Sequence, residues 1–224
     1  TEFSYETEFY ETETAIILYT SGTTGKPKGA MLTHFNLIHS CLHYKYAFNL
    51  TSNDHSILVV PASHVTGIVA HILLMIFVGG SLTLKKNFEV KDFLSSAENE
   101  GLTFVIMVPA MYNLCIERGD FNNLNLSHWR IGGFGGAPMP IGTLKKLNKA
   151  LPSLSLINIY GATETTSPVT IMPKKYSFDK LNSVGKCVPT GQIKIMNEKF
   201  EELSANQNGE LWISGPMVIP GYWN

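Results

Sequence analysis

The sequence has 224 residues, of which 44% are hydrophobic and 16% charged, and its formal net charge is −1 at pH 7. This length is enough to bury a sizeable core in one or two domains. The 17 lysines and arginines are scattered rather than gathered with aromatic residues into a basic patch, which argues against a nucleic-acid partner.

The three cysteines, Cys41, Cys115 and Cys187, lie far apart in the sequence. That spacing fits neither a zinc ribbon nor a compact disulfide framework. We therefore expect buried free thiols in a reducing compartment, where disulfides are rare.

The chain begins at Thr1 without a methionine and ends at Asn224 within a run rich in glycine and proline. We interpret it as an excerpt of a longer protein, whose targeting signals are therefore not visible. Residues 1–14 hold five glutamates and no basic residue, which predicts an acidic, solvated lead-in or linker.

Apolar runs typical of strands then alternate with helical patterns. The expected strands are Ala15–Tyr19, Ile57–Val60, Ser81–Leu84, Thr103–Val108, Trp129–Phe134 and Ser155–Tyr160. The expected helices are His34–Phe48, Val65–Val78, Val90–Glu100, Pro109–Arg118 and Pro140–Leu151. This alternation predicts an α/β fold with a mostly parallel sheet covered by helices on both faces. Ligands of such sheets bind in the loops at the carboxyl ends of the strands.

One uncharged stretch, from His55 to Leu84, is long enough to cross a bilayer. Prolines, histidines and glycines interrupt it, including the pair Gly79 and Gly80. A buried strand, a polar turn and a buried helix explain this stretch better than a membrane span.

After about Thr170 the helical periodicity disappears. Two short strands, Gln192–Met196 and Glu210–Ser214, are expected between turns rich in glycine, proline and asparagine. We therefore divide the chain into an α/β subdomain over residues 15–168 and a smaller β-rich, truncated unit over residues 169–224.

The loop Thr20–Gly29 contains four hydroxyl side chains and two lysines. Glycines let backbone N–H groups point at an anion, while hydroxyl and ammonium groups add donors and charge. Because Pro27 follows Lys26 and Gly29 follows Lys28, the loop does not match the P-loop pattern. It indicates another way of holding nucleotide phosphates; an ordinary solvated hairpin is the alternative.

Thr163 and Glu164 directly follow the expected strand Ser155–Tyr160. A carboxylate beside a phosphate is repulsive unless a cation lies between them, and Mg²⁺ is normally held by hard oxygen ligands together with substrate phosphates. Thr163 could donate a hydrogen bond to a phosphate oxygen while Glu164 binds the metal. The alternative is a solvated loop carboxylate.

Three further features have weaker signals. The glycine run Gly132–Pro138 lacks the third glycine of a dinucleotide fingerprint, because Pro138 occupies that position. It favours either a close backbone approach to a flat ligand or a tight turn.

His64 opens a helix just past a strand end and is either a core residue or a functional one. His39 and His43 have metal-ligand spacing but lack the intervening glutamate of a zincin, so we expect structural histidines.

Six ordered segments together resemble the adenylate-forming, AMP-binding superfamily, and most closely its acyl-CoA synthetases and other acid–CoA ligases. The segments are ILYTSGTTGKPK with GAMLTH (residues 17–34), PASHVTG (61–67), GGFGGAPMP (132–140), INIYGATETT (157–166), SVGKCVPTG (183–191) and GELWISGPMVIPGYWN (209–224). The resemblance covers nearly everything after residue 14, and the phosphate loop and YGATE are its most specific motifs.

The resemblance implies a role for each matching residue. The β- and γ-phosphates of ATP would be bound by Thr20, Ser21, Gly22, Thr23, Thr24, Gly25 and Lys28, and the α-phosphate by Thr163. Adenine would lie among Gly136, Ala137, Asn158, Tyr160 and Gly161. The acyl pocket would contain His64, Thr66 and Gly135, and Glu164 would hold Mg²⁺. His64, Lys28, Thr163 and Glu164 would be the catalytic residues.

The reaction implied by the resemblance has two steps. A carboxylic acid and ATP form an acyl-adenylate and pyrophosphate, and coenzyme A then takes the acyl group as a thioester. A fatty or aromatic acid is favoured over acetate by the apolar residues that follow His64. The expected location is cytoplasmic, with peripheral membrane contact if the acid is long-chain.

Other outputs remain open. A luciferase-like enzyme, a fatty-acyl-AMP ligase and an amino-acid adenylation domain share the first step, and a non-catalytic nucleotide-binding domain is an alternative of a different class. The segment lacks the family's ribose-binding aspartate motif and its small C-terminal domain, so we expect the 224 residues alone not to turn over.

Overall fold

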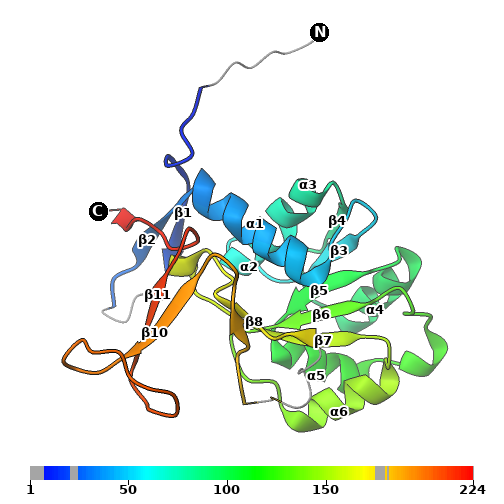
Figure 1. Cartoon of the computed structure of the whole chain (residues 1–224). Helices are drawn as coiled ribbons and strands as arrows, with labels where there is room; N and C mark the ends of the chain where they lie inside the picture. Colours follow the sequence, from blue (N-terminus) through cyan, green and yellow to red (C-terminus); the bar gives the residue numbers. More distant parts are fainter. Residues whose placement is uncertain (1–7, 21–24, 175–179, 181, 224) are drawn as a thin grey trace.

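The computed structural model describes residues 8–20, 25–174, 180 and 182–223 (Figure 1). The strands are β1 (Thr14–Thr20), β2 (Lys28–Thr33), β3 (His55–Leu58), β4 (Ser81–Leu84), β5 (Phe104–Met107), β6 (Ile131–Phe134), β7 (Ser155–Tyr160), β8 (Thr170–Ile171), β9 (Lys186–Cys187), β10 (Gln192–Met196), β11 (Glu210–Ser214) and β12 (Tyr222–Trp223). The α-helices are α1 (His34–Phe48), α2 (Val65–Gly67), α3 (Leu74–Val78), α4 (Val90–Asn99), α5 (Pro109–Arg118) and α6 (Ile141–Ala150).

A seven-stranded sheet in the order β4-β3-β5-β6-β7-β8-β9 forms the centre of the molecule. The strands from β4 to β7 are parallel, whereas β8 is antiparallel to both of its neighbours. Helices cover both faces, with α1 to α3 on one face and α4 to α6 on the other (Figure 1). The predicted α/β class with a mostly parallel, doubly covered sheet is confirmed.

Alternation along the central strand β5 explains why the molecule has two cores. Phe104 and Ile106 pack with α1 and the segment around α2 and α3, whereas Val105 and Met107 pack with α4, α5 and α6. All four side chains are buried. A strand that buries both faces reads as a continuous apolar run, and this is the pattern that predicted it.

The expected strand at residues 15–19 exists, but its predicted place in the parallel sheet is wrong. As β1 it pairs antiparallel with β2, and β12 completes a separate three-stranded sheet. β2 was not among the strands expected from the sequence. A short connection favours antiparallel pairing, because a parallel crossover needs a dozen or more residues.

The expected helix over residues 65–78 forms one continuous helical segment. Its middle, Ile68–Leu73, is π-helical and joins α2 to α3. Such insertions are frequent at functional sites. Within the described parts of the chain, no helix combines the length and apolarity needed to cross a bilayer.

The two strands expected near the carboxyl end form the antiparallel hairpin β10–β11. The division of the chain at residue 168 stays a prediction; the seven-stranded sheet itself continues past that point through β8 and β9. All three cysteines are free thiols, and Cys41 and Cys115 are buried as expected, whereas Cys187 is only partly buried.

Candidate functional site

The first of two adjoining cavities lies at the carboxyl ends of β6 and β7 and has a volume of about 480 Å³. Its lining residues are Gly136, Ala137, Pro138, Asn158, Ile159, Tyr160, Gly161, Asn182, Ser183 and Val184. All five residues predicted to surround adenine are among them.

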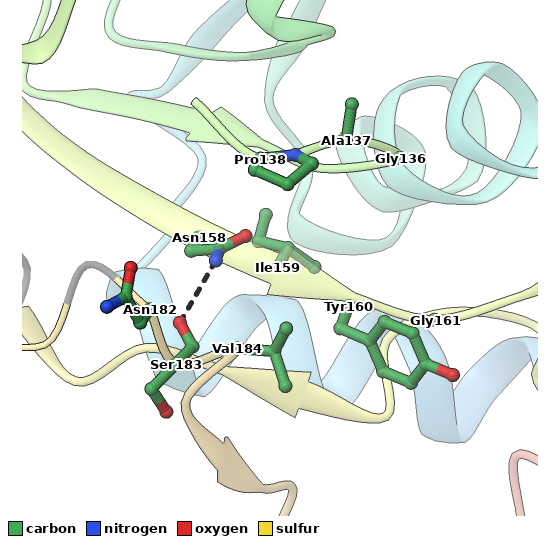
Figure 2. A pocket seen from close by; sticks show the side chains of 10 residues that line it. All are labelled: Gly136, Ala137, Pro138, Asn158, Ile159, Tyr160, Gly161, Asn182, Ser183 and Val184. Atoms are coloured by element: carbon green, nitrogen blue, oxygen red, sulfur yellow. Dashed lines mark hydrogen bonds between the residues drawn. The ribbon is translucent and has the colours of Figure 1, made fainter. Parts of the chain in front are cut away.

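Figure 2 shows this cavity with the segment after β6 on one side and residues 182–184 on the other. The Asn158 amide nitrogen donates a hydrogen bond to the Ser183 carbonyl oxygen at 3.1 Å. This bond fixes the amide, so its oxygen is available as an acceptor. Apart from the Tyr160 phenol, the described lining residues carry no ionisable side chain, which suits an uncharged flat ring.

The second cavity, of about 390 Å³, lies beside the carboxyl ends of β3 and β5. It is lined mostly by apolar side chains: Val59, Val60, Pro61, Val65, Phe88, Ile106, Met107, Val108, Met111, Ile159 and Ala162. Its other lining residues are Tyr44, His64, Thr66, Gly135, Gly136, Gly161, Thr163 and Ser167. The three residues predicted for the acyl pocket are therefore together, with Thr163 beside them.

The two cavities share Gly136, Ile159 and Gly161 and are therefore neighbours. Gly135 stands at this junction, where a Cβ atom would collide with the backbone carbonyl oxygen of Ile159. Glycine is needed because the contacting atom is main chain and cannot move aside cheaply. A ligand could extend from one cavity to the other along this glycine-rich wall.

The geometry of His64 fixes its tautomer. As the N-cap of α2, its Nδ1 accepts a hydrogen bond from the Thr66 backbone N–H at 3.2 Å. The proton of the neutral ring must therefore reside on Nε2, which makes Nε2–H a donor. Burial lowers the pKa of His64, so the ring stays neutral at physiological pH. Gly67 permits this turn, since a Cβ there would collide with the Pro61 carbonyl oxygen.

The described ends of the predicted phosphate loop belong to the β1–β2 hairpin. Thr20 ends β1 opposite Lys28, which begins β2, and the exposed Gly25 has a φ of 85°. The predicted residues Ser21, Gly22, Thr23 and Thr24 lie outside the described residues. The alternative of a hairpin and the prediction of a phosphate loop are thus compatible.

Lys28 and Glu164 meet at a third residue, Tyr222. The Tyr222 hydroxyl donates a hydrogen bond to Glu164 Oε1 at 2.8 Å, and Lys28 Nζ lies 5.2 Å from the centroid of the Tyr222 ring. Glu164 belongs to a 3-10 turn, Thr163–Thr165, that follows β7. Lys28, at the start of β2, and the predicted metal-binding carboxylate of Glu164 therefore lie on the same side of the molecule.

Two non-glycine residues just after this turn have positive φ, 50° for Thr166 and 38° for Ser167. The buried Tyr44 hydroxyl, which comes from helix α1, lies 3.0 Å from Ser167 Oγ and holds this part of the backbone in place. Conformations of this kind cost free energy and cluster at active sites and ligand clamps. The turn carrying Glu164 is thus held in one conformation by packing.

Sequence reasoning missed several residues of this region. Tyr222, Ser183 and Val184 occur in motifs that were recognised, but no role was given to them, and Asn182 lies just outside its nearest motif. Phe88 and Met111 gave no signal, because single apolar residues in a loop and a helix look like ordinary core. Only the fold brings them to the second cavity.

Comparison with known proteins adds the deciding observation: the model of the AMP-binding enzyme family matches residues 4–223. The chain belongs to the AMP-binding enzyme family. The resemblance found in its motifs is therefore confirmed.

Relatives within the family include several CoA ligases. The chain is 30% identical over 212 residues to a feruloyl-CoA synthase of Amycolatopsis sp., which covers 94% of this chain and 43% of that protein. It is 30% identical over 210 residues to 2-succinylbenzoate–CoA ligase of Bacillus licheniformis, covering 94% of this chain and 42% of that one. The chain thus spans less than half the length of these AMP-binding relatives.

Among solved structures, the chain resembles O-succinylbenzoate coenzyme A synthetase (MenE) from Bacillus subtilis in complex with ATP and magnesium ion. The TM-score is 0.88 at 29% identity, and the match covers 100% of this chain and 46% of that one. The roles of individual residues in this AMP-binding chain stay predictions.

Proposed function

We propose that the protein containing this chain activates a carboxylic acid with ATP and transfers the acyl group to coenzyme A. The observation that carries this proposal is the meeting of two unlike cavities at a glycine-rich wall, with Thr163 in the lining of the second cavity. CoA ligases at about 30% identity support the same assignment. In this proposal adenine occupies the cavity beside Asn158, and the acid occupies the cavity beside His64.

The metal expected at Glu164 is Mg²⁺. Among the described residues, no three His, Cys, Asp or Glu side chains gather into a group that could hold a metal ion. A single carboxylate suits Mg²⁺, which is usually bound through one or two carboxylates plus substrate phosphates and water. The donor set therefore fits a metal that arrives with ATP, and such a metal would neutralise phosphate charge.

The first step joins two anions. A carboxylate oxygen of the acid attacks the α-phosphorus, a new P–O bond forms, and the bond to the β-phosphate oxygen breaks to release pyrophosphate. His64 Nε2–H, the Thr163 hydroxyl and the Lys28 ammonium would supply donors and charge around this centre. Catalysis of this kind depends on positioning and on charge stabilisation more than on covalent chemistry.

In the second step the coenzyme A thiolate attacks the acyl carbonyl carbon, and AMP leaves with the former carboxylate oxygen. The thiol proton is lost to solvent or to a base outside the described residues. The product is an acyl thioester.

The acid that fits best has one carboxyl group and an apolar body. Beyond His64 the second cavity is lined by Phe88, Met111, Val108 and other apolar side chains, and none of its described lining residues offers a charged partner for a second ionised group. A volume of about 390 Å³ lies within the range of small-molecule sites and exceeds the needs of acetate. An aromatic or medium-chain acid therefore suits this cavity.

The test is acid-dependent ATP–pyrophosphate exchange by the full-length protein with a panel of aromatic, aliphatic and amino acids. We expect exchange with apolar monocarboxylic acids and formation of a thioester when coenzyme A is added. Glu164→Gln should lower the exchange rate by roughly 10²-fold, because a preorganised charge stabiliser is lost. The exposed Glu198→Gln variant serves as the matched control.

Three outcomes would contradict the proposal. Binding of Mg²⁺–ATP without exchange for any acid would favour a non-catalytic nucleotide-binding domain. Release of the acyl-adenylate without thioester formation would favour an enzyme with another output. A preference for amino acids would favour an amino-acid adenylation domain.

A further inference from the structure

The side chain of Tyr222 contacts both Lys28 and Glu164. Building on the proposed function, we propose that Tyr222 is a positioning residue for the metal-binding carboxylate of Glu164 and for the Lys28 ammonium. It would act through these two groups and would not itself touch the reacting atoms.

The main chain around Tyr222 is bonded to the elements that carry both partners. Tyr222 pairs with Ala30 of β2, the strand that begins with Lys28. On the other side, the Ile219 backbone N–H donates a hydrogen bond to the Glu164 carbonyl oxygen at 3.0 Å. The short segment 219–222 therefore links the phosphate-loop hairpin to the turn after β7.

The hydrogen bond suits a carboxylate that binds a metal. It engages Oε1 of Glu164 and so restrains the carboxylate, while the second oxygen would remain available to a cation. The Tyr222 hydroxyl is the donor in this bond, because an ionised carboxylate oxygen can only accept. Partners that orient a ligating carboxylate typically contribute roughly 10- to 100-fold to metal affinity or activity.

The ring of Tyr222 has a second, separable effect. An ammonium group over an aromatic face is attracted by the ring quadrupole, and at exposed sites this attraction is weak. Lys28 is long and flexible, so an aromatic surface beneath it limits where its charge can lie. The hydroxyl and the ring face thus act on different partners and can be tested separately.

A purely structural role for the hydroxyl would be to tie β12 to the core. The side chain of Tyr222 is 43% exposed, and backbone pairing holds β12 to β2 without any help from the hydroxyl. Loss of the hydroxyl should therefore leave the free energy of unfolding nearly unchanged. A change in magnesium dependence would then report on the positioning role.

The decisive experiment measures ATP binding by Tyr222→Phe in the full-length protein, with Mg²⁺ and with EDTA. The phenylalanine keeps the ring for Lys28 and removes only the hydrogen bond to Glu164. We expect the affinity for Mg²⁺–ATP to fall about tenfold, from the range given for such partners, and the affinity for metal-free ATP to stay unchanged. The Mg²⁺ concentration for half-maximal pyrophosphate exchange should rise by a similar factor. Tyr46→Phe, at an exposed position on α1, is the control.

A double-mutant comparison identifies the partner. In the Glu164→Gln background, Tyr222→Phe should cause no further loss of Mg²⁺–ATP affinity, because the carboxylate that it orients is gone. Additive losses would overturn the proposal, as would an unchanged or lowered magnesium requirement in the single variant. Equal weakening of ATP binding with and without metal would also overturn it.

The two proposals fail in different ways. An active wild-type enzyme whose Tyr222→Phe variant binds Mg²⁺–ATP normally would refute the role of Tyr222 alone. A wild-type protein that binds Mg²⁺–ATP but exchanges pyrophosphate with no acid would refute the proposed function, while the binding measurements would still test Tyr222.

Discussion

Lys28 and Glu164, which lie far apart in the sequence, share the Tyr222 side chain as a neighbour. The carboxylate accepts a hydrogen bond from its hydroxyl, and the ammonium lies over its ring. β2, which begins with Lys28, also runs beside the turn Thr163–Thr165. Opposite charges are thus gathered at one end of the molecule, next to the cavity that contains Thr163.

This arrangement predicts that the two lysines of the loop are not equivalent. Lys28 is partly buried against Tyr222, whereas Lys26 is exposed two residues earlier. Replacing Lys28 with alanine should lower pyrophosphate exchange by about 10²-fold, the usual effect of losing one preorganised charge stabiliser. Lys26→Ala is the matched control and should remain within about twofold of wild type, because exposed substitutions have small effects. Equal losses in both variants would mean that the loop contributes only general positive charge.

A second prediction concerns Phe88 as a wall of the acid cavity. Phe88 lines the second cavity and also a smaller one of about 180 Å³, which is bounded by residues of α4 and α5. Replacing Phe88 with alanine should join the two spaces and admit longer or bulkier acids. We expect the ratio of kcat/KM for a large acid to that for a small one to rise about tenfold, a change typical of one or two methylene groups in an apolar pocket.

The exposed Phe200→Ala variant controls for the loss of an aromatic side chain elsewhere. Phe88→Ala should also lower stability, since it removes part of a packed core, but that loss would act on all acids alike. An unchanged ratio would remove Phe88 from substrate selection.

A third prediction concerns acid sensitivity. His71 is completely buried between the helices and the sheet; its Nε2–H donates to the Ile106 carbonyl oxygen at 3.0 Å, and its Nδ1 lies 2.9 Å from Ser56 Oγ. Burial lowers the pKa of His71 to about 4, and that of His43 also falls to about 4. In the unfolded chain these histidines titrate near their ordinary pKa of about 6.5.

The direction in which the free energy of unfolding changes with pH follows from proton binding. Between pH 6.5 and 4 the unfolded state binds more protons, so the free energy of unfolding is highest above about pH 6.5 and falls as the pH drops toward about 4. A shift of this size corresponds to about 3 kcal/mol for His71, as an order of magnitude. Urea unfolding monitored by tryptophan fluorescence should therefore show a smaller pH slope for His71→Gln than for wild type. The exposed His128→Gln variant should keep the wild-type slope.

Much of the fold could be predicted from periodicity. The inner strands of the parallel sheet read as apolar runs because both of their faces are buried, and β5 illustrates this most clearly. The strand at residues 15–19 gave the same signal, yet it belongs to a different sheet. The local pattern indicates a strand but identifies neither its burial nor its pairing partner, since β1 is mostly exposed and pairing depends on contacts distant in sequence.

The structure brings together the residues predicted for adenine and for the acid, while their roles stay predictions. The residues proposed for adenine and for the acid lie in short motifs at strand ends. Parallel strands bring their carboxyl ends to one edge of a sheet, so these motifs come together there. Tyr222 could not be inferred in this way, because its contact with Glu164 depends on the β12–β2 pairing. The tautomer of His64 could not be inferred from the sequence either, because it depends on a helix cap that is visible only in the folded structure.

The last prediction concerns Asn36, which holds the segment leading to Tyr222. Its buried side chain caps α1 by accepting a hydrogen bond from the Thr33 backbone N–H at 2.9 Å. Its amide nitrogen also donates to the carbonyl oxygens of Pro216 and Val218, at 2.7 and 3.0 Å. One amide therefore joins the start of α1 to a distant part of the chain.

Asn36→Ala should destabilise the protein by about 2–3 kcal/mol, because two carbonyl oxygens lose their donor and the helix loses part of its cap. Asn148→Ala, on the exposed face of α6, should change the unfolding free energy by less than about 0.5 kcal/mol. Asn36→Asp keeps the acceptor for Thr33 but turns a carboxylate toward the two carbonyl oxygens, so it should be at least as destabilising as alanine. If aspartate instead restored stability, the cap alone would account for the effect, and the link to the segment before Tyr222 would contribute nothing.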